Sequence, residues 1–556
     1  MSKAKSKDFW ESVRTEEKYQ KIVGKIRGYY EQHRTDTIES LGYALRMRHD
    51  RDGNRSEFEE KYFSRRYYMC SAALLSLIYP EEPKYLNELH EIVWAICEEY
   101  CWVLPAHVKF AEFDDNSYID LFAAETAFSL AEIRYMLEDR LEDKLKKRIR
   151  ESLEWRILRN IERGPMNWEA TDNNWAAVIG GGVGGALMYA FPEKFDQYLP
   201  RFLNTMKSFF SGYSDEGVCY EGLGYWHYGY GSFVWFADLL YQYSDGTIDL
   251  FDDAKTERCA AYGQYNFIKG NAKISFSDSS RSGDVDACMQ NYLAARYPKT
   301  VYPLPESLTT DVWAGNLVWM RLLRALYYLN DQPAPENIKT ANYYLPDAGQ
   351  VIINNDRYSL VVKGGHNDEC EGHNDVGNFI LSTEMGQIFS DIGSGVYTRE
   401  NFMPETRYEI FCNGSQGHSV PIINGQRQKH GREYNGTLNY EGSEIKIEFS
   451  AAYGLPEFDR LTRTFVYEDD RVLLTDSFDS DYDSITERFI TLIKPEIIGN
   501  LVKIGNTTMR FDATIADVCI IPTEHHVSGG IEIVYCLDFK LKQGLECVTF
   551  EIIINH

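Results

Sequence analysis

The chain has 556 residues and a formal net charge of −26, with 44 % hydrophobic and 26 % charged residues. This length exceeds what a single hydrophobic core usually serves, so we expect at least two domains. The composition is that of an ordinary folded protein. The negative charge argues against nucleic acid as a partner, because phosphate binding needs a basic surface.

The apolar segments and the cysteines indicate the cellular compartment of the protein. It contains no stretch of about 18 apolar residues, so no membrane-spanning helix is expected, and the N-terminal segment MSKAKSKDFW lacks the apolar run of a signal peptide. The 11 cysteines are scattered and form no CxxC pair, which favours reduced thiols over a disulfide framework. We therefore expect a cytoplasmic protein without a membrane partner, and a homo-oligomer stays open.

Residues 1–335 are predicted to form helices. Segments such as YLNELHEIVWAICEEY and YIDLFAAETAFSLAEIRYMLED carry apolar residues at three- and four-residue spacing, the period of an amphipathic helix. The connections are short and often contain Pro, Gly or Asp, which favours antiparallel pairs of neighbouring helices. So many helices in series predict a helical toroid or solenoid.

The period of the pattern changes near Pro333. The segment NDQPAPENIKT has the composition of a linker. Residues 345–556 then show short alternating runs such as RVLLTDSF, rich in β-branched and aromatic residues and separated by turn residues. We expect an antiparallel β-sandwich here. The chain is thus predicted to be a multidomain α+β protein with its site in a cleft between the two domains.

The segment ATDNNWAAVIGGGVGGALMYA predicts the start of a helix. Asp172 or Asn173 suits the N-cap position, and capping alone accounts for either residue. The glycines between Gly180 and Gly185 indicate close packing of one helix on another. A nucleotide-binding loop is not favoured, because the segment lacks the strand–turn–helix context of such a loop.

Aromatic residues are unusually frequent, with 39 Tyr, 29 Phe and 10 Trp. Rings with an apolar face and a polar tip suit sugar binding, although most of them are expected in the core. The segment YSDEGVCYEGLGYWHYGYGSF concentrates five tyrosines, with Asp215 and Glu221 beside a turn. A tyrosine hydroxyl can act as an acid or a base where a nearby cation lowers its pKa.

A third segment, KGGHNDECEGHNDVGNF, contains His-Asn-Asp twice, at His366 and at His373. With Asp391 and His418 further along the chain, His373 offers two imidazoles and a carboxylate, a set that suits zinc. A polar turn network held by Asx hydrogen bonds explains the same residues without a metal. Spacing leaves both interpretations open.

Several segments resemble the heparinase II/III family and its alginate-lyase relatives, and they occur in the family's order: WVLPAH, YIDLFAAETAF, NNWAAVIGGG, DEGVCYEGLGYWHYG, GGHNDECEGHNDVGNFIL, DIGSGVYTRENF and GHSVPIINGQ. The resemblance covers most of the chain. It implies an incomplete (α/α) toroid followed by an antiparallel β-sandwich, in agreement with the predicted order of helices and strands. It also implies a polysaccharide lyase that cleaves uronic-acid-containing glycans, here acidic oligosaccharides, by β-elimination.

The resemblance assigns roles to residues of this chain. Asn174 matches the residue that neutralises the uronate carboxylate, and Tyr228 matches the catalytic tyrosine. His373, Asp391 and His418 match a structural zinc site. The residues expected near the substrate are Asn173, His107, Tyr225, His227, Tyr230, Tyr397 and Arg407, of which His107 and His227 are also candidates for a general acid or base.

One position departs from the family pattern. Related sequences commonly have His where this chain has Glu371, and a carboxylate near an anionic uronate is repulsive unless it is protonated or paired. His366 is a candidate for the missing catalytic histidine, or the substrate lacks a carboxylate there. Alternatively, Glu371 is an acid of a glycoside hydrolase, paired with Glu221 or Asp215, or the chain binds sugar without cleaving it.

Overall fold

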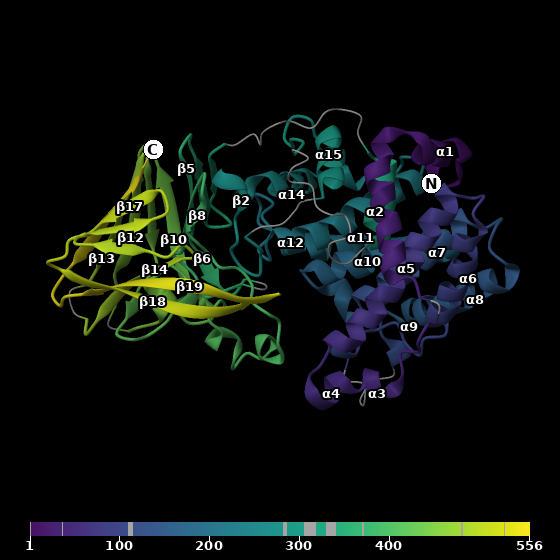
Figure 1. Ribbon diagram of the computed structural model, residues 1–556, viewed down its shortest axis with the longest axis horizontal. Helices are drawn as coiled ribbons and strands as arrows, with labels where there is room; N and C mark the ends of the chain where they lie inside the picture. Colours follow the sequence, from purple (N-terminus) through teal and green to yellow (C-terminus); the bar gives the residue numbers. More distant parts are fainter. Residues whose placement is uncertain are drawn as a thin grey trace.

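The computed structural model describes residues 2–35, 37–108, 115–281, 286–304, 318–329, 341–369, 372–456, 458–479, 482–527 and 529–555. Helices occupy the first part of the chain and strands the second, in two domains that lie side by side (Figure 1). This order confirms the predicted fold class. The predicted linker, residues 330–340, lies outside the described residues.

The helical domain is the incomplete (α/α) toroid expected from the sequence. Its helices are α1 (Lys7–Thr15), α2 (Glu17–His33), α3 (Tyr43–Arg46), α4 (Arg48–Asp52), α5 (Ser56–Ile78), α6 (Pro83–Cys97), α7 (Leu121–Met136), α8 (Asp143–Leu153), α9 (Arg159–Arg163), α10 (Asn174–Ala190), α11 (Pro192–Ser211), α12 (Leu223–Tyr225), α13 (Gly231–Tyr243), α14 (Ala254–Tyr265), α15 (Ala287–Arg296) and α16 (Val318–Tyr327). Among the described helices, none combines the length and the apolar content needed to cross a bilayer.

Helix α10 lies at the centre of this domain, packed against α7, α11 and α13. Its glycine run lets these neighbours approach closely, as predicted. A Cβ atom at Gly182 would lie 3.0 Å from the carbonyl carbon of Ala124 in α7, and one at Gly185 would lie 2.5 Å from the Phe128 ring. The spacing of α7 and α10 therefore depends on glycine, because larger side chains would overlap with the facing helix.

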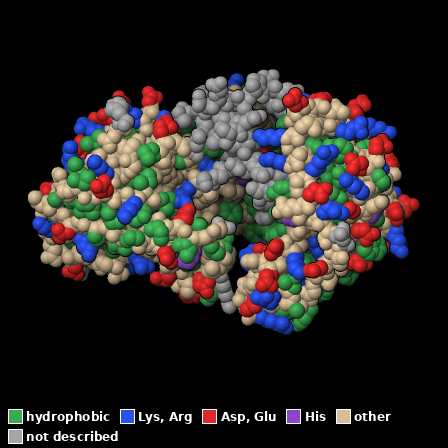
Figure 2. All heavy atoms as spheres, in the orientation of Figure 1, with side chains coloured by type: hydrophobic (Ala, Val, Ile, Leu, Met, Phe, Trp, Pro, Cys, Tyr) green, Lys and Arg blue, Asp and Glu red, His purple; other side chains and the backbone are tan. Residues whose placement is uncertain are grey.

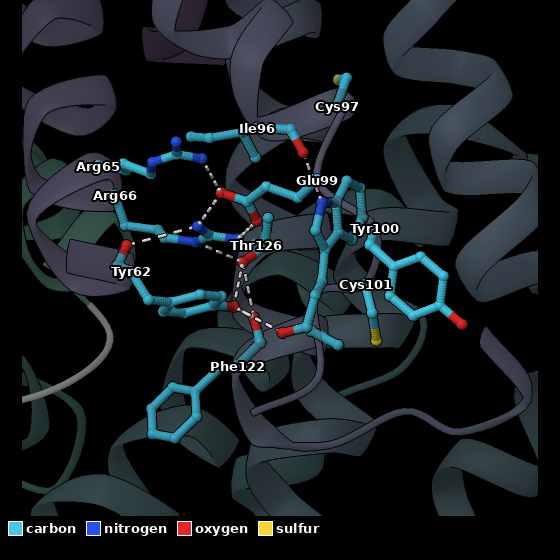
Figure 3. A network of polar contacts seen from close by, with 12 residues as sticks. Tyr62, Arg65, Arg66, Ile96, Cys97, Glu99, Tyr100, Cys101, Phe122 and Thr126 are labelled. Carbon is cyan, nitrogen blue, oxygen red and sulfur yellow. Dashed lines mark hydrogen bonds and ion pairs between the residues drawn. The ribbon is translucent and has the colours of Figure 1, made fainter. Parts of the chain in front are cut away.

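A buried ion-pair network fixes the segment that leads from α6 to α7 (Figure 3). The Arg66 guanidinium donates two hydrogen bonds to Glu99, at 2.7 and 2.6 Å, and Arg65 donates a third at 2.8 Å. Tyr62 donates from its hydroxyl to the Trp102 carbonyl at 2.8 Å. Buried charges of this kind are stable only when paired. The network thus holds in place the chain that continues to His107.

The β-domain consists of antiparallel strands in three sheets. A five-stranded sheet contains β3 (Tyr343–Leu345), β4 (Gln350–Asn354), β5 (Tyr358–Lys363), β7 (Phe379–Thr383) and β8 (Gly386–Phe389). A nine-stranded sheet contains, in spatial order, β15 (Glu496–Ile498), β16 (Leu501–Ile504), β17 (Thr507–Arg510), β20 (Cys547–Ile554), β13 (Arg471–Phe478), β12 (Leu461–Tyr467), β11 (Glu444–Glu448), β10 (Gly431–Glu441) and β6 (Gly365–Asn367). A four-stranded sheet contains β18 (Ala516–Val527), β19 (Gly530–Leu541), β14 (Ile485–Thr491) and β9 (Ile422–Ile423).

Aromatic rings join the three sheets in one core. The Phe379 ring of the five-stranded sheet lies 5.2 Å from that of Phe465 in the nine-stranded sheet and 6.1 Å from that of Phe489 in the four-stranded sheet. Alternating strands such as β13 turn every second side chain into this core. The predicted antiparallel sandwich is confirmed.

One segment of the first part of the chain lies on the β-domain. Residues 267–281, which we call the strap, follow α14 and include the strands β1 (Phe267–Ile268) and β2 (Ala272–Lys273). Figure 1 shows β2 beside β8. The Gln387 side-chain amide donates to the Lys273 carbonyl at 2.7 Å, and Ser382 donates to the Lys269 carbonyl at 2.8 Å. The strap therefore ties the helical part of the chain to the β-domain.

Replacing Gly182 by alanine is expected to force α7 and α10 apart and to lower the stability by about 1–3 kcal/mol. Gly24 in α2 is the matched control, because a Cβ atom there meets nothing within 4 Å. Gly24→Ala should leave the stability unchanged or raise it by about 0.5–1 kcal/mol. Thermal unfolding of both variants measures the difference, and equal melting temperatures would contradict the close packing described here.

Candidate active site and metal centre

The start of α10 carries two of the predicted residues. Asn173 is the N-cap, and its side-chain oxygen accepts a hydrogen bond from the Trp175 backbone N–H at 3.1 Å, which confirms the predicted helix start. Asn174 is the first helical residue, and it is buried. Its Nδ2 donates to Glu221 Oε1 at 2.9 Å. An amide nitrogen carries two hydrogens, so one remains for a further acceptor.

Tyr228 lies on a π-helical turn (Trp226–Tyr230, the Tyr228 turn) that runs directly into α13. Such turns are rare and occur frequently at functional sites. Gly229 lets this turn touch the start of α10, because a Cβ atom there would lie 3.1 Å from Asn174 Cβ and 3.0 Å from the Phe209 ring. The structure thus packs the Tyr228 turn against Asn174, although the two segments are far apart in the sequence.

The Tyr228 hydroxyl donates to Glu125 Oε1 of α7 at 2.8 Å. Burial raises the pKa of Tyr228 well above its usual value, and the Glu125 carboxylate raises it further, while the charge of Arg321 in α16 opposes the shift. Tyr228 is therefore a neutral phenol at neutral pH, and its hydroxyl is oriented by a hydrogen bond to a carboxylate.

His107 forms a pair with Asp120 beside these residues. Its Nδ1 lies 2.7 Å from Asp120 Oδ2, and its ring stacks on Phe122 at a centroid distance of 5.7 Å, with Trp175 at 5.1 Å. Asp120 is fully buried and caps α7, where its other oxygen accepts from a backbone N–H. Because a carboxylate accepts hydrogen bonds, Nδ1 carries the proton and Nε2 is the basic nitrogen of His107.

Two of the predicted aromatic residues meet across the two domains. The hydroxyl oxygens of Tyr225 in the helical domain and Tyr397 in the β-domain lie 3.4 Å apart. Tyr397 is 39 % exposed, so its ring is accessible. Figure 2 shows a hollow between the two domains. A sugar chain bound between the domains would meet rings of this kind.

Two other predicted residues of the same segment lie in the core. Tyr230 is fully buried and donates its hydroxyl hydrogen to the Thr256 carbonyl at 2.8 Å. His227 accepts at Nε2 from the Asp286 backbone N–H at 3.2 Å. Burial lowers the pKa of His227 well below its usual value, and Arg321 adds to the shift. His227 is thus a neutral acceptor that holds the chain after the strap against the Tyr228 turn.

The loop after β5 carries the candidates that depart from the family pattern. Glu371 lies outside the described residues, so the glycoside-hydrolase alternative built on it stays a prediction. His366 is half-buried on β6, and its Nδ1 accepts from the Asp368 backbone N–H at 3.2 Å. Burial lowers the pKa of His366. Nearby, Lys363 is buried and forms an ion pair with Glu369 at 2.9 Å.

The predicted metal ligands form one cluster. His373, Asp391 and His418 are fully buried, and each offers a ligand atom within 4.8 Å of those of the other two. His418 Nδ1 lies 3.1 Å from Asp391 Oδ2. The Asn378 amide donates to the same Asp391 oxygen at 2.8 Å.

The protonation pattern of this cluster fits a cation. His418 Nε2 donates to the Cys412 carbonyl at 2.9 Å, which leaves an unprotonated Nδ1 facing the Asp391 carboxylate in the neutral imidazole. Burial alone would lower the pKa of His418, but Asp391 outweighs it and the net direction is upward. His373 Nδ1 is buried without a hydrogen-bond partner. A metal ion among these atoms would satisfy all three residues.

The remaining nitrogen of His373 is held by a residue that sequence reasoning did not identify. His373 Nε2 lies 3.0 Å from Asp278 Oδ1 in the strap. Arg407, predicted to contact substrate, donates to the second oxygen of Asp278 at 3.4 Å. An outer carboxylate that orients a metal-binding histidine is common in metalloproteins.

Sequence reasoning also gave no role to Glu125, Asp120 and Arg321. Glu125 could have been noticed, because it is a single carboxylate in the apolar stretch LFAAETAFSLA. A buried charge inside an apolar helix face usually has a partner. Asp278, in the polar stretch SFSDSS, gives no comparable signal in the sequence.

Comparisons with known proteins agree with this architecture. Residues 338–512 match the family model described as heparinase II/III-like, C-terminal. A search of curated proteins gives no match. Among solved structures, a heparinase III has a TM-score of 0.62 at 12 % identity, over 96 % of this chain and 84 % of that one.

Two further structures are similar over nearly the whole chain. A mutant of the heparan sulfate lyase HepC from Pedobacter heparinus has a TM-score of 0.58 at 10 % identity, over 99 % of this chain and 93 % of that one. The chondroitin AC lyase of Streptomyces coelicolor A3, in complex with chondroitin sulphate, has a TM-score of 0.57 at 9 % identity, over 99 % and 82 %. The resemblance to the heparinase II/III-like polysaccharide lyases is thus confirmed, and at these identities the solved structures show the fold alone.

Proposed function

We propose that this chain is a polysaccharide lyase that cleaves uronic-acid-containing glycans by β-elimination. The observation that carries the proposal is the contact at Gly229, which places the Tyr228 turn against Asn174. These are the two residues that the resemblance assigns to the reaction. The packing of these two segments, in a chain with the fold of known lyases, supports a shared chemistry.

The reaction makes three demands. The C5 proton moves to a base, its electron pair forms the C4–C5 double bond, and the C4–O bond breaks as an acid protonates the leaving oxygen. The uronate carboxylate must also be neutralised, so that the developing enolate is stabilised. We assign this neutralisation to the second amide hydrogen of Asn174. The positive charge of Arg321 helps, since it lies close enough to Tyr228 to act on its pKa.

Tyr228 and His107 are suited to the two proton transfers. Tyr228 is a neutral phenol in the free chain, because burial and Glu125 raise its pKa, so we assign it to protonation of the leaving oxygen. His107 directs Nδ1 to Asp120 and keeps Nε2 as a base. Asp120 lies close enough to raise the pKa of Tyr228 as well, which supports placing both groups at one substrate.

We further propose that His373, Asp391 and His418 bind a structural zinc ion. Two imidazoles and one carboxylate are zinc ligands. The buried, unpartnered Nδ1 of His373 and the Nδ1 of His418, which faces Asp391, support the assignment. Bound zinc would hold together the loops that carry these three residues. It takes no part in the proton transfers.

The substrate that we propose is an acidic oligosaccharide inside the cell. In the described part of the chain every cysteine is free, which suits a reducing compartment. The heparin, chondroitin and alginate types of uronate glycan are the first to test.

Tyr228→Phe is expected to lower the elimination rate by about 10²- to 10⁴-fold, because it removes the transferred proton. The measurement is the ultraviolet absorbance of the new double bond on a panel of uronate oligosaccharides. Tyr213→Phe is the matched control, since Tyr213 belongs to the same aromatic segment but packs against Phe209 in the core. Equal elimination rates for the two variants would contradict the role of Tyr228. Shortening of the oligosaccharides without a rise in absorbance would contradict elimination.

The purified chain is expected to contain a single zinc ion, and His418→Ala should lose it. His430→Ala is the control, because the His430 side chain is 43 % exposed and does not belong to the cluster of His373, Asp391 and His418. Removing the ion with a chelator should lower the melting temperature of the unmodified chain, since a ligand of the folded state stabilises it. Elemental analysis and thermal unfolding measure both effects. Full zinc content in His418→Ala would overturn the assignment.

A further inference from the structure

The strap reaches two of the three proposed zinc ligands. The Ser275 hydroxyl donates to the backbone carbonyl of Asp391 at 2.7 Å, and Asp278 holds His373. At its far end, Arg281 forms an ion pair with Glu532 of β19 at 2.6 Å. The strap is therefore fixed to the β-domain on both sides of Asp278.

The two oxygens of Asp278 have different partners. Oδ1 lies 3.0 Å from His373 Nε2, and Oδ2 accepts from Arg407 at 3.4 Å. Only 1 % of the Asp278 side chain is exposed. Asp278 stands outside the group of ligand atoms that lie within 4.8 Å of one another. It contacts a ligand and is not itself one of the ligand set.

The backbone around Asp278 is held in an unusual conformation. Ser277 has φ +62°, in the left-handed region that residues other than glycine rarely adopt. On the facing loop, Gly393 has φ +66°, and a Cβ atom there would lie 2.1 Å from the Ser279 carbonyl oxygen. Both features bring the strap close to the loop that carries Asp391, so the position of Asp278 is determined by the fold.

We propose that Asp278 is a positioning residue of the zinc centre, and that this carboxylate from the helical half of the chain completes a site whose ligands all lie in the β-domain. The proposal rests on the zinc site of the preceding subsection. Asp278 accepts the Nε2 hydrogen of His373 and so directs the lone pair of Nδ1 to the ion. Arg407 donates to the other oxygen of Asp278 and so helps to hold the carboxylate in this orientation.

This arrangement couples zinc binding to the docking of the strap. An ion that binds His373 favours the ring orientation in which Nε2 faces Asp278, so it also favours the docked strap. By linkage, a docked strap raises the affinity for zinc to the same degree. Further along the chain, the Asp286 backbone N–H donates to His227 in the Tyr228 turn.

The test compares zinc affinity in the full-length chain, in Asp278→Asn and in Glu532→Gln, by competition with a chromophoric chelator. Asp278→Asn keeps the shape of the side chain but loses its charge, and we expect it to weaken zinc binding by about 10- to 100-fold. Glu532→Gln is the matched control, because it breaks the ion pair with Arg281 away from the metal ligands, while the hydrogen bonds of Ser275 and Gln387 still dock the strap. Its zinc affinity should remain within about twofold of the unmodified chain.

Hydrogen exchange of the backbone amides in residues 267–281 is the second readout. In the unmodified chain, zinc should slow exchange in the strap, and in Asp278→Asn this protection should be reduced. If the unmodified chain binds no zinc, the zinc site and this inference both fail. If it binds zinc, and Asp278→Asn binds it equally well with equal protection of the strap, then only the role of Asp278 is overturned.

Discussion

The close approach of α10 to its neighbours is the constraint on which the proposed active site depends. Gly182 and Gly185 admit α7, and Gly229 admits the Tyr228 turn. Each contact leaves no room for a Cβ atom without a shift of the facing segment. As a result, the Tyr228 hydroxyl reaches Glu125 of α7 and the Tyr228 turn lies against Asn174 of α10, although the three segments are far apart in the sequence.

Each carboxylate of the proposed active site is paired with a residue assigned to the reaction. The chain carries a net charge of −26, and the site itself contains the carboxylates of Asp120, Glu125 and Glu221. Each accepts a hydrogen bond from a residue assigned to the reaction: His107, Tyr228 and Asn174. These carboxylates orient the reactive groups, and the paired donors reduce the repulsion that an acidic sugar would meet.

The sequence predicted the helical domain, the β-sandwich and the N-cap at Asn173, because each produces a local pattern of period or residue type. It also predicted that His373, Asp391 and His418 meet, through family resemblance. The roles of Asp278 and Asp120 could not be assigned, because they arise from contacts between segments distant in the chain. Glu125 stands out as a single carboxylate in an apolar stretch, but the sequence does not show its partner. Tyr230 was predicted to lie near the substrate because it shares the segment of Tyr228, but the turn directs its side chain into the core.

The central claim is that the Asn174–Tyr228 site performs an elimination. Mass spectrometry of the products from a defined uronate oligosaccharide tests it most directly, since elimination only redistributes the atoms of the substrate. The account predicts that the masses of the two fragments add up to the mass of the substrate, and that Asn174→Ala and Tyr228→Phe suppress both fragments. Fragments that together exceed the substrate by one water would show hydrolysis and contradict the account.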